Sequence, residues 1–203
     1  MRLLYSLLLF LIGLTNYAQQ LPSLQLVSPE DDYVYDIRYA GKNNFLEQAF
    51  YKCAKCYLRP EVAEALEQAR EYFYNKGYKI LLYDCFRPVE AQIKMWKAFP
   101  NPRYVANPYT KGSVHSRGAA VDISLIHRDG STVAMGTDHD HFGKEAHIDH
   151  HDLPEHVLKN RALLQKGMRK FGFNTIRTER WHFDYKNGYS YPIIKDELPC
   201  QNQ

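Results

Sequence analysis

Strong net charge is missing from this sequence, and so are long apolar runs beyond its N-terminal segment. The formal net charge is only +3, and the basic residues are dispersed rather than gathered in one stretch. A weak and dispersed charge does not favour binding to nucleic acid. Internal repeats, linkers and low-complexity segments are also lacking. With 203 residues, 45% of them hydrophobic, the chain is long enough for one domain with a real core.

Cysteine is scarce too, with four residues at Cys53, Cys56, Cys85 and Cys200. Four cysteines allow three complete pairings, and the sequence does not choose among them. The Cys-x-x-Cys pair formed by the first two could be half of a zinc knuckle, but no second pair of this kind exists. We therefore predict one or two disulfides, formed in an oxidising compartment.

The one long apolar run lies at the N-terminus, from Leu3 to Leu14, after a short basic start. A bilayer span needs about 20 residues, so this run is too short to cross comfortably. Ala18 follows as a small residue at a suitable cleavage position. We predict a signal peptide over residues 1–18 and an exported mature domain over residues 19–203 with no membrane partner. An uncleaved anchor is the alternative.

The mature chain mixes segments typical of strands with segments typical of helices. The predicted strands cover residues 34–39, 78–83, 119–126 and 178–185, and the predicted helices cover residues 60–76, 89–96 and 154–171. Pro60 and Gly77 mark the two ends of the first helix. Residues 100–112 and the histidine-rich residues 135–152 are expected to be loops. This mixture predicts a single α+β domain.

The stretch from Ser113 to Asp122 carries the first candidate functional residues. Asp122 lies between two apolar residues of a predicted strand, where a carboxylate is costly to bury unless a cation meets it. A turn at Gly118 would fold His115 back toward this carboxylate, because glycine tolerates backbone conformations that a β-carbon forbids. An imidazole and a carboxylate suit zinc, but two ligands are not sufficient.

A third ligand is offered by the pair Glu179-x-x-His182. In metal hydrolases such a histidine holds zinc, while the glutamate takes a proton from the water on the metal. His115, Asp122 and His182 would leave a fourth position open, which is typical of catalytic zinc. Arg87, at the end of a predicted strand, is a candidate for stabilising the oxyanion that forms during hydrolysis.

Together these residues resemble a known family. The pattern S-x-H-x-x-G-x-A-x-D from Ser113 to Asp122, followed by Glu179-x-x-His182, is similar to that of the zinc D-alanyl-D-alanine dipeptidases, which have the Hedgehog/DD-peptidase fold. The similarity covers residues 33–185. It includes Asp84-x-x-Arg87-Pro88 and Met135-Gly136-Thr137 with Asp140-x-Phe142. The resemblance implies a mainly antiparallel sheet flanked by helices.

The resemblance also implies a role for each matched residue. Three of them would hold one Zn²⁺ per chain: His115, Asp122 and His182. Glu179 would be the general base and acid, and Arg87 would stabilise the transition state. Asp140 would bind the free amino group of a small D,D-dipeptide, and Ser113 would contact the substrate. The implied activity is hydrolysis of D-Ala-D-Ala.

Two departures from the family pattern bear on substrate preference more than on zinc chemistry. Arg180 stands where the family often has tryptophan, and residues 138–141 lack the usual aromatic residue before the aspartate. Two alternatives remain. One is a D,D- or L,D-carboxypeptidase that trims peptidoglycan stem peptides in a more open groove. The other is a non-catalytic periplasmic protein that captures metal through the histidines of residues 139–156, although metal binding needs neither Glu179 nor Arg87.

Overall fold

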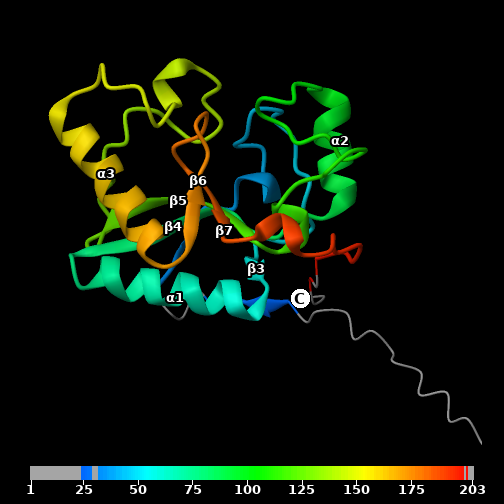
Figure 1. The fold of residues 1–203 in the computed structure, drawn as a ribbon, viewed down its shortest axis with the longest axis horizontal. Coiled ribbons are helices and arrows are strands. Elements are labelled where there is room, and N and C mark those ends of the chain that lie inside the picture. The colour runs from blue at the N-terminus through cyan, green and yellow to red at the C-terminus, as the bar shows by residue number, and fades with distance from the viewer. Residues whose placement is uncertain (1–23, 29–31, 199, 201–203) are drawn as a thin grey trace, which may run out of the picture.

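A five-stranded sheet forms the centre of the protein, of which a computed structural model describes residues 24–28, 32–198 and 200 (Figure 1). The strand order is β2-β4-β5-β7-β6, with the strands at Val34–Tyr35, Tyr78–Asp84, Ala120–His127, His182–Tyr185 and Phe173–Thr175. Every neighbouring pair is antiparallel except β2–β4, which is parallel. The predicted α+β fold with a mainly antiparallel sheet is confirmed. The predicted signal peptide lies outside the described residues.

Three helices flank this sheet: α1 (Pro60–Tyr74), α2 (Val89–Ala98) and α3 (Glu155–Lys170). Helices α1 and α3 contact each other and the sheet, while α2 lies apart from them at the other end of the molecule (Figure 1). The helices can pack closely because Gly167 on α3 has no β-carbon. One added there would lie 2.3 Å from the Phe73 ring on α1. Among the described residues, no helix has the length and apolar character needed to span a membrane.

A second, two-stranded sheet pairs β1 (Gln25–Leu26) with β3 (Tyr57–Leu58) in antiparallel fashion. Next to it, two disulfides join Cys53 to Cys200 and Cys56 to Cys85. The predicted disulfides are therefore confirmed, and the alternative of a zinc knuckle is excluded because both of its cysteines are oxidised.

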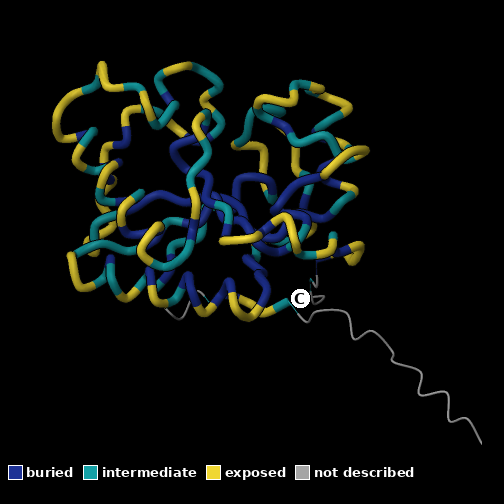
Figure 2. The backbone as a smooth tube through the Cα atoms, viewed as in Figure 1, coloured by how far each residue is buried: buried dark blue, intermediate teal, exposed yellow. Residues whose placement is uncertain are grey.

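Strand β5 lies in the middle of the large sheet and is buried on both faces (Figure 2). Its alternate residues Val121, Ile123 and Leu125 belong to the main hydrophobic core. The opposite face carries Asp122, which is only 2% exposed, and Ser124. The central strand thus brings a carboxylate into the interior, where it requires charged or hydrogen-bonding partners.

The last predicted strand is shorter than the pattern indicated. Strand β7 begins at His182, and the preceding residues 176–181 are irregular. Part of their backbone bonds to a loop, since Ile148 donates a hydrogen bond to the Arg177 carbonyl and Arg180 donates one to the Ala146 carbonyl, while the Trp181 carbonyl accepts one from Ile123 of β5. The short strand β6 at residues 173–175 was missed, and the strand predicted over residues 34–39 ends at Tyr35.

Candidate active site

Strand pairing brings the three predicted ligand residues together. Asp122 on β5 lies directly opposite His182 on β7 in the sheet register. His115 lies in a 3₁₀ turn just before β5, and Gly118 ends that turn with a φ of +66°. This left-handed conformation is the turn predicted at Gly118, and it brings His115 close to Asp122 on the strand that follows.

The ligand atoms of this group are spaced as a tetrahedral zinc ion requires. Asp122 Oδ1 lies 3.3 Å from His115 Nε2 and 3.0 Å from His182 Nδ1, and the two nitrogens are 3.1 Å apart. Ligands about 2.0–2.1 Å from zinc at tetrahedral angles are separated by about 3.3 Å. The donor set of two imidazoles and one carboxylate therefore fits zinc and leaves room for a fourth ligand.

Each of the two histidines turns one ring nitrogen toward this centre and is held by a hydrogen bond at its other ring nitrogen. His115 Nδ1 donates to the Cys85 carbonyl oxygen at 2.8 Å, which directs Nε2 toward Asp122 and His182. His182 Nε2 donates to Asp184 Oδ1 at 2.9 Å, which directs Nδ1 toward Asp122. Burial lowers the pKa of the His182 ring, but these two carboxylates raise it well above its usual value. Such partners on the far nitrogen fix the tautomer and orientation of metal-binding histidines. Two ring nitrogens and a carboxylate oxygen that converge in this way could hold a metal ion.

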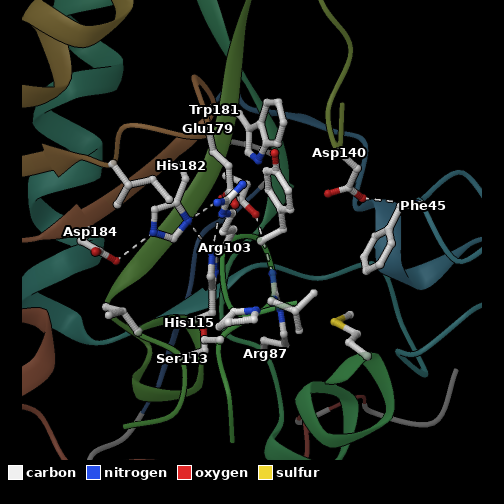
Figure 3. A pocket seen from close by; sticks show the side chains of 18 of the residues that line it. Phe45, Arg87, Arg103, Ser113, His115, Asp140, Glu179, Trp181, His182 and Asp184 are labelled. Atoms are coloured by element: carbon white, nitrogen blue, oxygen red, sulfur yellow. Dashed lines mark hydrogen bonds and ion pairs between the residues drawn. The ribbon is translucent and has the colours of Figure 1, made fainter. Parts of the chain in front are cut away.

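Glu179 borders the same cavity from the irregular segment before β7 (Figure 3). Its side chain is almost fully buried, and burial raises the pKa of its carboxyl group to about 8. The neighbouring carboxylates of Asp122 and Asp140 raise this pKa further, whereas His182 lowers it. A carboxyl group with a pKa near neutrality can both accept and return a proton, as a general base and acid must.

Arg87 is held in a fixed position at the floor of the cavity. Its Nε and Nη2 donate to Asp84 Oδ2 at 2.9 and 2.7 Å, and its Nη1 donates to Gln92 Oε1 at 2.9 Å. Tyr39 lies against the guanidinium, with its ring centre 5.0 Å away. Three of the five N–H groups are used in these bonds, so two remain for a substrate oxygen.

Asp140 lies on the opposite side of the cavity, in the loop before α3 (Figure 3). Its carboxylate accepts hydrogen bonds from the Tyr39 hydroxyl, at 3.1 and 3.2 Å, and from the Phe45 backbone amide. The backbone of Asp140 has a φ of +58°, which is uncommon for a residue with a β-carbon. The loop is therefore shaped to direct this carboxylate into the cavity.

Ser113 also lines the cavity, and its Oγ accepts a hydrogen bond from the His115 backbone amide at 3.2 Å. All seven residues predicted from the sequence thus border one cavity. Its volume is about 160 Å³. Pockets for drug-sized ligands are larger, at roughly 300–1,000 Å³. The cavity therefore suits a small substrate.

The histidine-rich loop adds no second ligand cluster within the described part of the chain, where one group of metal-ligand geometry is found. His139 turns inward and packs against the rings of Tyr83 and Trp181. His141 instead lies 3.2 Å from Glu145 at the surface. This arrangement does not favour the hypothesis of a metal-capture loop.

The family of this chain is shown by its similarity to known proteins. The sequence profile of the D-ala-D-ala dipeptidase family matches residues 19–200. The chain belongs to this family. A D-alanyl-D-alanine dipeptidase of Escherichia coli K12 is 34% identical over 181 residues, which are 89% of this chain and 92% of the relative. Another, from Enterococcus faecalis V583, is 31% identical over 169 residues, covering 73% and 84%.

Among solved structures, the vancomycin-resistance D,D-pentapeptidase in complex with Zn(II) matches 66% of this chain and 76% of its own. At 17% identity and a TM-score of 0.40, this likeness is too distant to carry an argument.

The two departures from the family pattern lie behind the cavity wall. Arg180 is buried, and its guanidinium donates to the hydroxyl and carbonyl oxygens of Thr137. His139 lies 3.5 Å from Asp122 and 3.3 Å from Asp140. Neither side chain lines the cavity, so any effect on substrate preference would act through the position of Asp140.

Several contacts that support the family's site were missed at the level of sequence. Asp84 and Gln92 hold Arg87, Asp184 holds His182, and Tyr39 holds Asp140. Two of these contacts could have been recognised from short spacings in the sequence. Asp84 precedes the arginine by three residues, and Asp184 follows the histidine by two, so the latter pair shares one face of a strand. The Tyr39 contact left no signal because Asp140 lies 101 positions away, and Gln92 left none because glutamine has many other uses in proteins.

Proposed function

We propose that this protein is a zinc-dependent dipeptidase that hydrolyses D-Ala-D-Ala. The observation that carries the proposal is the convergence of three zinc-type ligand atoms, within 3.3 Å of one another, beside Glu179 and Arg87 in one small cavity. The curated relatives bear the name of this activity. A metal-binding protein without catalysis would need neither the buried glutamate nor the buried arginine.

His115, Asp122 and His182 would hold one zinc ion per chain. When bound there, zinc supplies a water of lowered pKa and polarises the scissile carbonyl. Glu179 takes a proton at its carboxylate and later returns it to the leaving amine, which its raised pKa allows.

The charged neighbours position the substrate. Arg87 directs its two unused N–H groups at the oxyanion, while Asp84 prevents the guanidinium from turning away. Asp140 would bind the ammonium group of the dipeptide, held in position by Tyr39. Ser113 would offer its hydroxyl to the substrate beside His115.

The size of the cavity supports a dipeptide over a longer peptide. Four aromatic rings close one side by packing on each other: Phe45, Phe99, Tyr104 and Phe142. Three of these residues line the cavity itself. A carboxypeptidase that trims stem peptides would need an open groove where these rings lie. The carboxypeptidase is therefore the second candidate.

We further propose that the protein is exported after removal of residues 1–18. Both disulfides support an oxidising compartment, because such bonds rarely persist in the cytosol. Mass spectrometry of the protein from a cell fraction would test this. A mature N-terminus near residue 19 in the exported fraction is expected, and a full-length chain in the cytosol would contradict the proposal.

The activity is tested by incubating the zinc-loaded protein with D-Ala-D-Ala, L-Ala-L-Ala and a stem pentapeptide. Release of alanine from the D,D-dipeptide is expected, with loss of at least about a hundredfold in rate for Glu179→Ala. Glu155→Ala, at an exposed position in α3, serves as the matched control. Cleavage of the pentapeptide at a similar rate would shift the assignment to a carboxypeptidase. No cleavage with zinc bound would refute both.

A further inference from the structure

Arg103 is a second arginine that lines the cavity, and the roles described so far do not use it. Its side chain is exposed, and its guanidinium forms no ion pair with a carboxylate of the described residues. Figure 3 draws Arg103 near the centre of the site, among Glu179, His182 and His115. A cation without a partner at the mouth of a cavity is free to bind an anionic group of a ligand.

The backbone that carries Arg103 is held firmly. Its amide donates to Asn101 Oδ1 at 3.1 Å, which fixes the turn after α2. Tyr104, the next residue, stacks on Phe142 with ring centres 4.5 Å apart and donates to the Phe142 carbonyl. Gln92 donates to the Ala106 carbonyl at 2.7 Å, on the other side of the same turn.

Gln92 also connects this turn to Arg87, since its side-chain oxygen accepts a hydrogen bond from that guanidinium. One buried side-chain amide therefore links Arg87 to Ala106, three residues beyond Arg103. Arg87 is neutralised by Asp84, but Arg103 keeps its charge uncompensated by any carboxylate of the described residues.

The remaining charges of the cavity show what Arg103 is suited to bind. Asp122, Asp140, Glu179 and Asp184 are all acidic and all line the cavity. A free dipeptide carries an ammonium group at one end and a carboxylate at the other, about 7 Å apart when extended. Asp140 would bind the ammonium group, whereas the carboxylate would have only the neutral Ser113 hydroxyl as a partner.

We propose that Arg103 binds the C-terminal carboxylate of the substrate and makes the site select peptides with a free C-terminus. The inference rests on the proposed dipeptidase function. It gives the C-terminal carboxylate of the substrate a charged partner, which the other residues of the cavity do not provide. Arginine matches a carboxylate with two parallel N–H groups, so lysine in its place would lose part of the binding.

The test compares D-Ala-D-Ala with its C-terminal amide, using the zinc-loaded wild type, Arg103→Gln, Arg103→Lys and Arg177→Gln. Arg177 is an exposed arginine that pairs with Asp149 outside the cavity, so it controls for loss of surface charge. For Arg103→Gln we expect KM for the free dipeptide to rise about ten- to hundredfold, with kcat almost unchanged. KM for the amide should not change, and Arg103→Lys should lie between.

A binding measurement separates this inference from the proposed function. Calorimetry of both ligands with zinc-loaded Glu179→Gln, with and without Arg103→Gln, needs no catalysis. Loss of the preference for the free carboxylate upon removal of Arg103 supports the inference. An unchanged preference, or equal weakening of both ligands, overturns it. A wild type that cleaves neither ligand refutes the dipeptidase function, while the binding result still decides the role of Arg103.

Discussion

At the scale of single residues, each candidate ligand histidine is oriented by an oxygen atom on its far side. His115 uses a backbone carbonyl, which cannot be mutated, but His182 uses the Asp184 carboxylate. A carboxylate in this place also makes the imidazole more basic and so a stronger ligand. Asp184 is therefore expected to contribute to metal affinity, although it is not one of the three proposed ligands.

Replacing Asp184 tests this contribution. Asp184→Ala should weaken zinc binding about 10- to 100-fold in competition with a chelator, with Asp184→Asn less affected. Asp152→Ala, at an exposed loop position, is the matched control. The melting temperature of the zinc-free protein shows whether the variant folds. Zinc affinity equal to that of wild type would show that the Asp184 contact is not needed.

Burial of Glu179 predicts a pH dependence of stability in the zinc-free protein. Its pKa is about 8 in the folded state, against 4.5 when unfolded, so the folded state binds the proton more tightly. The resulting stabilisation is complete below pH 4.5 and is lost as the pH rises through 8. Between pH 5 and 8 the wild type should lose about 3 kcal/mol more than Glu179→Gln.

Denaturant unfolding of both proteins in the presence of EDTA measures this difference. Parallel pH profiles for wild type and Glu179→Gln would contradict the raised pKa. The comparison isolates one residue, because all other titrating groups are shared by the two proteins.

The proposed metal ligands could be picked out from the sequence because their pattern is local. His115 and Asp122 lie within eight residues, and Glu179 and His182 within four, so each pair shows in the order of the chain. His139 was missed because its contact with Asp122 spans 17 positions. Asp184 and Gln92 lie close to their partners in the chain, but aspartate and glutamine have many other uses in proteins. Arg103 lies in a loop that carries no motif.

At the scale of elements, the register between β5 and β7 sets the metal geometry, and the turn before β5 completes it. Gly118 has no β-carbon, and one added there would lie 2.8 Å from Leu24 Cδ2 and 3.4 Å from the Arg59 amide nitrogen. Its positive φ adds a backbone cost for any other residue. The turn that places His115 thus depends on one glycine.

Gly118→Ala should therefore destabilise the protein by about 2 kcal/mol and weaken zinc binding by displacing His115. Gly130→Ala is the matched control, since Gly130 has a φ of +88° but open space around it. The control bears the backbone cost alone, so the difference in zinc affinity reports the steric displacement. Equal zinc affinity in the two variants would contradict this account of the turn.

The fold class could be predicted because the periodic segments become regular elements at nearly the predicted residues. The segment before β7 was harder to predict. Residues 178–181 were predicted as part of the strand, yet the Arg180 amide bonds to the Ala146 carbonyl. Trp181 alone among these residues bonds to β5, through its carbonyl and the Ile123 amide. A pattern of side chains does not reveal which backbone a segment will pair with, so the length of the strand was overestimated.

At the scale of the whole molecule, the two disulfides differ in their distance from the site. Cys53–Cys200 ties the C-terminal tail to the N-terminal half, whereas Cys85 also supplies the carbonyl that holds His115. Replacing either pair with serine should cost about 2–5 kcal/mol of stability. Only loss of Cys56–Cys85 is expected to weaken zinc binding as well.

Unfolding curves and zinc competition on the two double variants, Cys53→Ser/Cys200→Ser and Cys56→Ser/Cys85→Ser, make this comparison directly. Each variant is the control for the other. Equal zinc affinities would show that the position of the Cys85 carbonyl does not depend on its disulfide.

The register that places Asp122 opposite His182 also determines when the ligand group can form during synthesis of the chain. A chain made from its N-terminus holds two metal ligands once Asp122 has emerged, and it must wait 60 residues for the third. The second disulfide waits longer still, for Cys200 near the end of the chain. A chain that stops before His182 cannot assemble the complete ligand group, so binding of the metal by all three residues must follow synthesis of β7.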